Sequence, residues 1–480
     1  MRPYFYGALR LGDMIMKKTT VRDLTSGSPM RLILGFMLPL LFGMLLQQLY
    51  SMIDTIIVGR YLGMEALAGV GSTGSINFLV IGFVQGLCTG FAIPIAQRFG
   101  AKDNKALRKF IGNTVWTAAV FALLLTAATC LMCTNILTWM KTPADVFDKA
   151  RDYIFVIFLG IPATVLYNIL SGFIRSVGDS KTPLIFLVIS SLLNIALDIF
   201  MIVVLQMSVA GAAWATVISQ LISGALCLIY IAKRINILHI RRKDLKLDFY
   251  YVKRLCAIGL PMGLQYSITA IGSIMLQTAV NSLGKTCMAA MTAGIRVSVF
   301  LTCPFEAMGS TMATWGGQNI GANKIERIRS GVFNCMILGI VWAAVALGIS
   351  LLFGRGLVML FVDKNNVPSP EQMEEVVSLG RQFLITNASF YVGLAVVNIV
   401  RFLIQGMGFS QLALFAGVFE MIARGFVGLQ TVPKIGFTGA CFASPAAWIL
   451  ADLFLIPAFF ACYYHVKKRL TAERADDPKV

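Results

Sequence analysis

Hydrophobic residues along the chain form long runs that polar segments interrupt at regular intervals. Each run has about 20 residues or more, the length that an α-helix needs to cross the hydrocarbon core of a bilayer. The pattern therefore predicts an all-α integral membrane protein with twelve transmembrane helices. We place the helices at 31–58, 66–95, 110–138, 151–174, 183–206, 209–232, 255–281, 288–316, 330–361, 378–405, 411–432 and 436–464.

The same arrangement of residues occurs twice, with the second copy about 220 residues after the first. The matched pairs include Leu38-Pro39 with Leu260-Pro261, Gln97 with Gln318, Gly100 with Gly321, Ile174 with Ile404, Gly178 with Gly408, and Ser180 with Ser410. Six helices per copy is an even number, so both copies enter the membrane the same way up. This predicts two six-helix lobes related by an internal parallel repeat, an architecture of secondary transporters.

These boundaries divide the chain into five parts. They are a cytoplasmic N-terminal segment (1–30), an N-terminal six-helix lobe (31–233), a cytoplasmic linker (234–253), a C-terminal six-helix lobe (254–464) and a cytoplasmic tail (465–480). Residues 1–16 are too few and too mixed to span a bilayer, and one interpretation is an extension upstream of Met16.

The number and placement of charged residues support a membrane protein and indicate its orientation. Only 13% of the residues are charged, whereas soluble domains carry about 25%. The net charge of +18 comes from Lys and Arg in alternate loops, such as 98–109 and 233–246, while the opposite loops are short or acidic, as around Asp363. Loop bias of this kind places Lys and Arg on the cytoplasmic side. We therefore expect a protein of the cytoplasmic membrane, with both termini cytoplasmic and no nucleic-acid partner.

Two acidic side chains, Asp54 and Asp198, lie within spans of the first copy without a nearby cation. An ionisable group at mid-depth costs at least ~2.5–3.5 kcal/mol, so function is the default interpretation. Gln47, Tyr50 and Asp54 share one helix face, and Asn194 shares another with Asp198. Burial disfavours the ionised carboxylate, so the pair requires a proton or a metal ion. The alternative is that each acid merely hydrogen-bonds a neighbouring backbone.

In the second copy, opposite charges are available to pair. Glu420 and Arg424 are four residues apart, a spacing that favours a salt bridge. Arg401 and Asp452 are further charged residues in predicted spans. We therefore predict that these four residues form a structural charge network.

Other polar or helix-bending residues of the spans are candidates for the substrate path. The residues that we expect in a substrate cavity are Gln47, Tyr50, Ser171, Arg296 and Glu306. Proline removes a backbone hydrogen bond and bends a helix, so Pro39 and Pro261 are candidate hinges, with a static kink as the alternative. The matched loops 97–109 and 318–329 are interpreted as helix ends with charged caps in preference to a gate.

Several classes of function conflict with the residues present. The chain has two histidines, too few for a multi-histidine metal site, and its cysteines lie mostly in hydrophobic spans, where packing is their usual role. Gly284-Lys285-Thr286 lacks the first glycine of a phosphate-binding loop. We therefore expect no ATP and no cofactor beyond a coupling ion, and we give a membrane enzyme or a receptor-like role little weight.

Four motifs resemble those of the multidrug and toxic compound extrusion (MATE) transporters. They are Asp54-Thr55, Gly178-Asp179-x-Lys181-x-Pro183, Asn194-x-x-x-Asp198 and Gly317-Gln318-Asn319-x-Gly321-Ala322. The resemblance runs from about residue 17 to 465. It implies two lobes around a central cavity that opens to one side at a time, and export driven by inward H+ or Na+.

The resemblance is to the DinF-like branch, which keeps its acids in the N-terminal lobe. It implies a cation site formed by Asp54, Tyr153, Asn194, Asp198 and Thr216. An asparagine expected on the fourth helix corresponds to Asn168, or is replaced by Ser171. Where the ion is Na+, the expected metal ligands are Asp54, Asn194 and Asp198. Another branch uses a glutamate on the seventh helix, which this chain lacks.

Together these observations predict a secondary antiporter, expected to be a monomer, that exports amphipathic, mostly cationic organic compounds in exchange for H+ or Na+. Asp54 and Asp198 are its predicted coupling site, and its partners are small organic cations and the lipid bilayer. The main alternative is a flippase for lipid-linked precursors. Such a cavity would hold phosphate with cations, for which Arg296 and Arg401 are the candidates.

Overall fold

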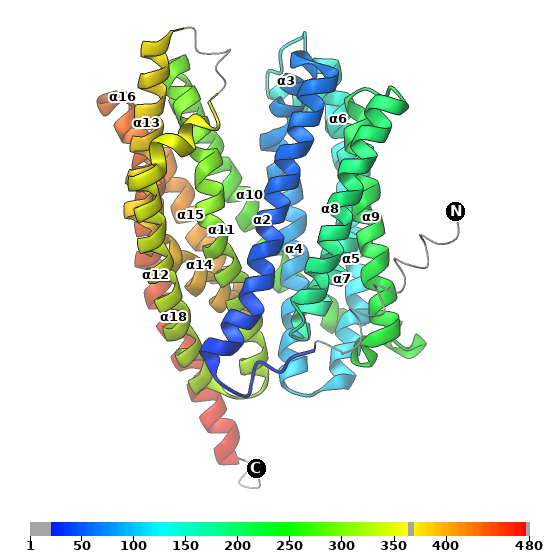
Figure 1. Ribbon diagram of the computed structural model, residues 1–480. Coiled ribbons are helices and arrows are strands. Elements are labelled where there is room, and N and C mark those ends of the chain that lie inside the picture. Colours follow the sequence, from blue (N-terminus) through cyan, green and yellow to red (C-terminus); the bar gives the residue numbers. More distant parts are fainter. Residues whose placement is uncertain (1–20, 363–368, 477–480) are drawn as a thin grey trace.

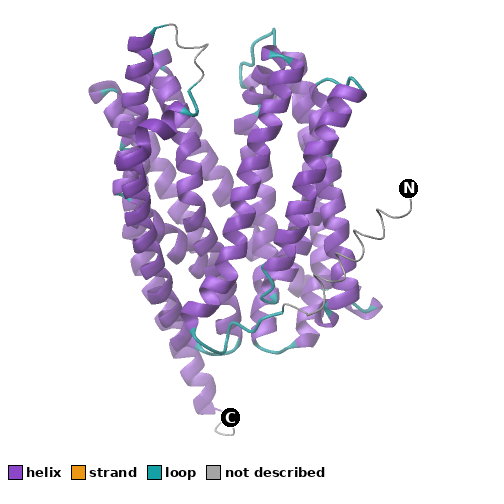
Figure 2. Cartoon of the chain, in the orientation of Figure 1, coloured by secondary structure: helices purple, strands orange, loops and turns teal. Residues whose placement is uncertain are grey.

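The computed structural model describes residues 21–362 and 369–476, and these residues form helices and no strand. Figure 2 shows the helices running side by side between two ends of the molecule. Ten helices are long and apolar enough to cross a membrane, or twelve if two bent pairs each form one span. The predicted all-α membrane fold is confirmed. Residues 1–16, Asp363 and the last residues of the predicted tail lie outside the described residues.

The first half of the chain contains α2 to α9. Their bounds are α2 Pro29–Leu62, α3 Met64–Ser72, α4 Gly74–Gly100, α5 Asn104–Trp139, α6 Phe147–Leu159, α7 Ile161–Ser176, α8 Lys181–Ile199 and α9 Val209–Arg234. A π-helical segment, Phe200–Val204, extends α8. Two short 3-10 helices, Asn236–Leu238 and Arg242–Leu245, lie in the linker.

The second half contains α10 to α18. Their bounds are α10 Phe249–Asn281, α11 Lys285–Gly321, α12 Ile325–Met359, α13 Pro370–Ser389, α14 Tyr391–Gly406, α15 Ser410–Phe426, α16 Val432–Ile435, α17 Phe437–Cys441 and α18 Ala443–Asp476. A π-helical segment, Val427–Thr431, extends α15 as its counterpart extends α8. The last helix continues to Asp476, well past the predicted boundary at 464.

Two of the predicted spans, 151–174 and 378–405, are broken helices. The axes of α6 and α7 differ by 45°, and those of α13 and α14 by 53°. Pro162 lies in the first turn of α7, where a missing N–H is tolerated, and it marks the first break. The second break, at Phe390, has neither proline nor glycine beside it. The predicted hinges Pro39 and Pro261, in contrast, lie inside unbroken helices.

The two halves lie side by side and meet along α4 and α10 (Figure 1). Glycines allow the two backbones to touch. A Cβ atom on Gly90 would lie 2.5 Å from the Cα of Gly259, and a Cβ on Gly86 would collide with the carbonyl oxygen of Met262. Any larger side chain at these positions would separate the halves, because packed backbones cannot yield by a side-chain rotation.

At the end of the molecule where the C-terminus lies, matched glutamines join the halves. Gln97 Nε2 donates to the carbonyl oxygen of Gly406 at 3.0 Å. Gln318 Nε2 donates to the carbonyl oxygen of Ser176 at 2.8 Å. Gln97 and Gln318 are a matched pair of the repeat, so one hydrogen bond is the counterpart of the other.

Glycines of the same repeat complete this contact. A Cβ atom on Gly100 would collide with the backbone of Gln318, and one on Gly321 would collide with the backbone of Gln97. The ends of α4 and α11 therefore pack backbone to backbone. We call the four residues Gln97, Gly100, Gln318 and Gly321 the reciprocal contact. Sequence reasoning preferred a capping role for these loops, and the structure adds a direct joint between the halves.

The segment before α2 crosses this joint. Leu24 N donates to Gln318 Oε1 at 2.9 Å, and Lys324 Nζ donates to the carbonyl oxygen of Thr25 at 2.8 Å. Burial opposes ionisation of Asp23, but hydrogen bonds from Thr25 and the charges of Lys324 and Lys102 outweigh it and hold the pKa of Asp23 below its usual value. Asp23 thus interacts with a lysine from each of the two matched loops.

Helix α2 packs against both halves. Ile33 and Phe36, near its start, belong to the hydrophobic core of the second half, whereas Ile57 and Val58, near its end, belong to the core of the first half. A movement of one half relative to the other would therefore strain or bend α2 between these two regions. Pro39 lies within this stretch.

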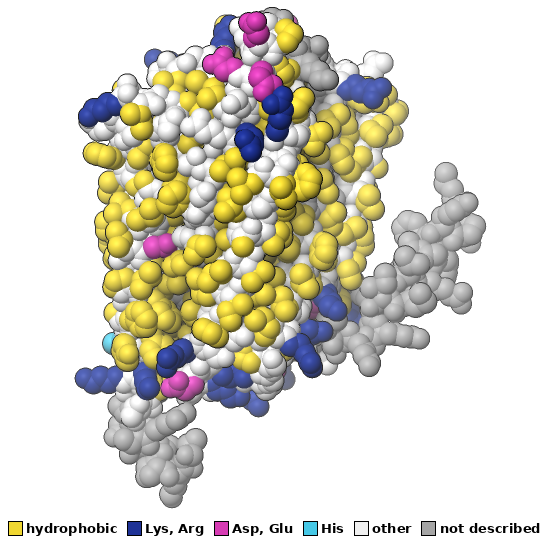
Figure 3. All heavy atoms as spheres, turned by 60° about the vertical axis from the view of Figure 1, so that its left-hand side comes forward, with side chains coloured by type: hydrophobic (Ala, Val, Ile, Leu, Met, Phe, Trp, Pro, Cys, Tyr) yellow, Lys and Arg dark blue, Asp and Glu magenta, His cyan; other side chains and the backbone are white. Residues whose placement is uncertain are grey.

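The surface agrees with a bilayer setting. Figure 3 shows hydrophobic side chains over the middle of the visible face, with Lys and Arg toward both ends. Large apolar side chains such as Leu131, Leu352 and Leu360 are each more than three-quarters exposed. Exposed apolar area on this scale indicates contact with lipid.

Candidate functional site

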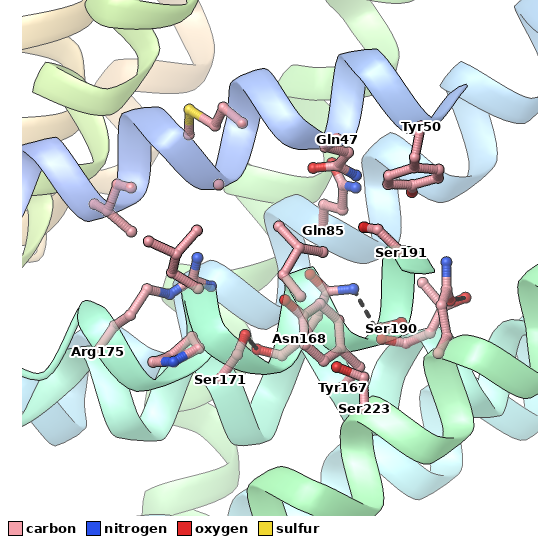
Figure 4. A pocket seen from close by; sticks show the side chains of 18 of the residues that line it. Gln47, Tyr50, Gln85, Tyr167, Asn168, Ser171, Arg175, Ser190, Ser191 and Ser223 are labelled. Carbon is pink, nitrogen blue, oxygen red and sulfur yellow. Dashed lines mark hydrogen bonds between the residues drawn. The ribbon is translucent and has the colours of Figure 1, made fainter. Parts of the chain in front are cut away.

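A polar cavity of about 170 Å³ lies within the first half, bounded by α2, α4, α7, α8 and α9. Three residues that the sequence placed in a substrate cavity, Gln47, Tyr50 and Ser171, line it. Figure 4 shows these side chains directed into the same space as Gln85, Tyr167, Asn168, Arg175 and the serines of α8 and α9. Tyr266 of α10 and Ser310 of α11 close the side toward the second half.

Arg175 is the one charged residue among those that line this cavity. It lies in the last turn of α7 and extends into the cavity (Figure 4). No salt bridge to it is found within residues 21–362 and 369–476. The sequence did not predict Arg175 as a cavity residue, because it lies at a helix end, where an arginine is ordinarily solvated. Its position three residues before the Gly178-Asp179 motif could have indicated a role.

The predicted coupling residues come together behind the wall of this cavity. Asp54 of α2 and Asp198 of α8 interact directly, and Tyr153 of α6 is an electrostatic neighbour of both. Asn194 Nδ2 lies 3.5 Å from Thr216 Oγ1, and both of these residues line the cavity. Asp54, Asp198 and Tyr153 thus lie together, and Asn194, with Thr216 beside it, is one helical turn from Asp198 on α8.

Oxygen atoms in this region lack hydrogen-bond donors. Asp54 Oδ1, Asn194 Oδ1 and both carboxylate oxygens of Asp198 are buried and accept no hydrogen bond from any described residue. Asp198 is fully buried and Asn194 is nearly so. Buried acceptors without donors are unfavourable. These four oxygens, which we call the acceptor cluster, would be satisfied by a proton or a cation.

The sixth residue, Asn168, lies apart from the cluster. Its side chain lines the cavity, and Asn168 Nδ2 donates to the carbonyl oxygen of Thr164 at 2.8 Å, within its own helix. The alternative residue Ser171 also lines the cavity, one turn away, and donates to the carbonyl oxygen of Asn168. Neither hydroxyl nor amide reaches the aspartates.

Two residues that the sequence placed in a substrate cavity, Arg296 and Glu306, do not line this cavity. Arg296 and Glu306 of α11 are both exposed, and neither lines the cavities at the two sides of that helix. Ile295 and Thr302 face the cavity of the second half, and Arg296 is turned about 100° from Ile295, as successive helical residues are. The electrostatic neighbours of Glu306 are Tyr266 and Arg401, of α10 and α14.

The charged residues of the second half form a compact cluster. Arg401 Nη1 lies 2.7 Å from Glu420 Oε1, and Arg424 Nη2 lies 3.3 Å from Glu420 Oε2. All three side chains are at least nine-tenths buried. Asp452 forms no salt bridge within the described chain, and its electrostatic neighbours are Glu420 and Arg401.

The chemistry of the acceptor cluster is that of a hard, small cation. In the described part of the chain no three His, Cys, Asp or Glu side chains approach closely enough to hold a metal ion as a group. Two carboxylates with neighbouring amide and hydroxyl oxygens suit a proton or an ion such as Na+ better than a transition metal.

Comparisons with known proteins agree on one family. The family described as MatE matches residues 39–200 and again residues 261–428, once in each half. "Probable multidrug resistance protein YoeA" of Bacillus subtilis is 26% identical over 447 residues, which cover 91% of this chain and 94% of that protein. "DNA damage-inducible protein F" of Escherichia coli is 25% identical over 436 residues, covering 87% of this chain and 88% of that protein.

A solved structure has the same fold. The structure titled "Crystal structure of MATE in complex with MaL6" superposes with a TM-score of 0.86 at 22% identity, covering 94% of this chain and 100% of that chain. The two matches to the family, one per half, correspond to the internal repeat that the sequence predicts.

Proposed function

Because the chain belongs to the MatE family, the multidrug and toxic compound extrusion transporters, we propose that it exports amphipathic organic compounds in exchange for H+ or Na+. It is a multi-pass membrane transporter rather than an enzyme. The proposed setting is the cytoplasmic membrane, with the loops 98–109 and 233–246, which are rich in Lys and Arg, in the cytoplasm.

The acceptor cluster is the observation that carries the proposed coupling. Asp54 and Asp198 are close, and no salt bridge to either is found in the part of the chain that the structure describes. One proton shared between the two carboxylates, or one Na+ among the four oxygens, would relieve the repulsion that two empty carboxylates exert on each other. Ion binding would therefore favour whichever conformation holds the two acids together, which is the requirement for coupling.

Helix α2 supplies the proposed link between ion and substrate. It carries Asp54 in the cluster, Gln47 and Tyr50 in the cavity wall, and Pro39 nearer its start. Loading of the cluster draws this face of α2 toward α8. We propose that α2 then bends near Pro39, that the cavity closes around a smaller volume, and that the substrate is released outward.

The proposed substrate is amphipathic. The cavity combines hydroxyl and amide groups with apolar side chains such as Leu40, Met44 and Leu187. The acids, from which the sequence predicted cationic substrates, lie behind the wall, while Arg175 lies in it. We therefore propose cationic substrates whose apolar ring, rather than their charged group, makes the main contact with the cavity.

The proposal is tested by efflux of the cationic dye ethidium from vesicles that contain the purified protein. Na+ and pH gradients are imposed separately, for wild type, Asp54→Asn and Asp198→Asn. At least one gradient is expected to drive efflux in wild type, and both variants are expected to be at least ~10-fold slower.

The matched control is Asp152→Asn, which removes an exposed carboxylate of α6 and should transport at the wild-type rate. Wild-type rates in both aspartate variants would refute the coupling site. Absence of efflux under either gradient in wild type would refute exchange with H+ or Na+.

A flippase for lipid-linked precursors is the second candidate, and Arg175 favours it. Of the two arginines first considered, Arg401 is paired with Glu420 and Arg296 lies outside the cavity walls. A cavity cation without a partner would suit a phosphate group. Faster translocation of a fluorescent lipid phosphate than of ethidium, abolished by Arg175→Gln, would favour this candidate over drug export.

A further inference from the structure

A second cavity, of about 420 Å³, lies on the second half where it faces the start of α4. Its walls come mainly from α10 and α11, with two residues each from α13 and α18 and single residues of α14 and α15. Four aromatic side chains line it: Phe78, Phe383, Tyr391 and Trp448. No role in ion coupling follows from this cavity, because its lining contains no carboxylate.

Three buried polar atoms in its walls have no hydrogen-bond partner. They are Arg424 Nη1, Tyr391 Oη and Ser298 Oγ. Tyr391 is fully buried and Arg424 is 7% exposed. The side chains of Tyr391 and Ser298 interact with each other, so one hydroxyl can serve the other. Arg424 Nη1 has no such neighbour, and a buried donor without an acceptor is unfavourable, which indicates a group that supplies an acceptor there.

The charged side chain in the wall of this cavity is a cation, Arg424. Arg401 and Arg424 share the single carboxylate of Glu420, which Arg401 contacts more closely. Arg424 is the one charged residue in the lining, and it uses Nη2 for Glu420 and leaves Nη1 free. Two further acids, Asp452 and Glu306, interact with Arg401, and neither lines the cavity.

We propose that this cavity binds an aromatic carboxylate, with the carboxylate on Arg424, Tyr391 and Ser298 and the ring against Trp448 and Phe383. A guanidinium is the side chain best suited to a carboxylate, because its planar N–H groups match the two oxygens. The aromatic walls favour a ring over an inorganic anion. The site is separate from the acceptor cluster, so the proposal does not depend on the proposed ion coupling.

The test measures binding of 2-naphthoate and its neutral isostere 2-naphthamide to the purified full-length protein in detergent, by isothermal titration calorimetry. Naphthoate is expected to bind at least ~10-fold more tightly than naphthamide, since only the anion pairs with the guanidinium. Arg424→Gln should remove this preference, Arg424→Lys should retain part of it, and Tyr391→Phe should weaken naphthoate about threefold.

Controls separate this site from the first cavity and from misfolding. Arg175→Gln should leave the preference for naphthoate intact, and Arg424→Gln should remain folded because Arg401 still pairs with Glu420. Equal binding of the two ligands to wild type, or a preference that survives Arg424→Gln, would overturn the proposal. So would loss of the preference in Arg175→Gln, or displacement of naphthoate by equimolar inorganic phosphate.

Discussion

The two halves place different chemistry at corresponding positions of one repeat. Counted from the matched pairs Gly178/Gly408 and Ser180/Ser410, Ser171, Ser190 and Asn194 of the first half correspond to Arg401, Glu420 and Arg424 of the second. The first three are small polar residues that line a cavity. The second three are a buried cluster of ion pairs.

This difference teaches how a duplicated membrane fold can divide its tasks. Glu420 already has two arginines as partners, so the second half has little need of an external cation at this position. In the first half the nearby acids Asp54 and Asp198 have no such partner and require one from solution. The same backbone is thus compatible with a fixed cluster and with a site that can be loaded and emptied.

The largest expected effect comes from removing the shared carboxylate. Glu420→Gln leaves Arg401 and Arg424 buried without a counter-charge, so the free energy of unfolding should fall by about 3–5 kcal/mol. Thermal unfolding in detergent measures this. The matched control is Ser190→Ala, at the corresponding position, which removes one hydrogen bond to Ser219 and should cost about 1 kcal/mol. Equal melting temperatures for the two variants would contradict the comparison.

The opposite pattern is expected for the acid of the first half. Asp198→Asn removes an uncompensated buried charge, so stability should be unchanged or higher by about 1 kcal/mol. Ion-driven transport should nevertheless fall at least ~10-fold, because the acceptor cluster loses a carboxylate. Unfolding and vesicle efflux are measured on the same preparation. A variant that is destabilised and still transports would reverse the assignment of the two halves.

A smaller effect is expected at the reciprocal contact. Gln97→Ala should lower the free energy of unfolding by about 1 kcal/mol, and Gln318→Ala by somewhat more, since Gln318 Oε1 also accepts from Leu24. If the two glutamines hold one joint, the double variant should deviate from additivity by at least ~0.5 kcal/mol. Gln372→Ala, an exposed glutamine of α13, is the control and should have little effect. Strict additivity would mean that the two bonds act independently.

The smallest effect concerns Asp23. Its pKa lies below the ordinary 3.8, so its contribution to stability is present above that pH and is lost as pH falls through the lower, folded-state pKa. Asp23→Asn should therefore lower stability at pH 6 by at most about 0.5 kcal/mol, since the group is largely exposed. Melting curves of the two proteins should converge below about pH 3.8. A constant difference at all pH values would remove charge as the cause.

The sequence was sufficient for the spans and for the duplication. Runs of apolar residues of bilayer length and the matched pairs such as Gly178/Gly408 are local signals, and they depend on nothing that is distant in the chain. The residues near the acceptor cluster could also be proposed, because Asn194 and Asp198 share a helix face and Asp54 stands out in its span.

The remaining features depend on how helices pack. Nothing beside Phe390 signals a bend of 53° between α13 and α14. Arg175 sits at a helix end, and only the approach of α2 and α10 turns that end into a cavity wall. The pairing of Arg401 with Glu420 joins residues of two helices, and residue spacing along one helix reveals only the weaker partner, Arg424.

The reciprocal contact has a consequence for how the lower end could open. Each glutamine donates a hydrogen bond to the opposite half, and each glycine lets the backbone of the opposite half approach closely. Both halves therefore contribute equally to the contact. Rotation of either half would break both glutamine hydrogen bonds together, because the two bonds are counterparts in the repeat. The reciprocal contact is therefore expected to be either fully formed or fully broken. A half-open state, through which solute could leak, is disfavoured.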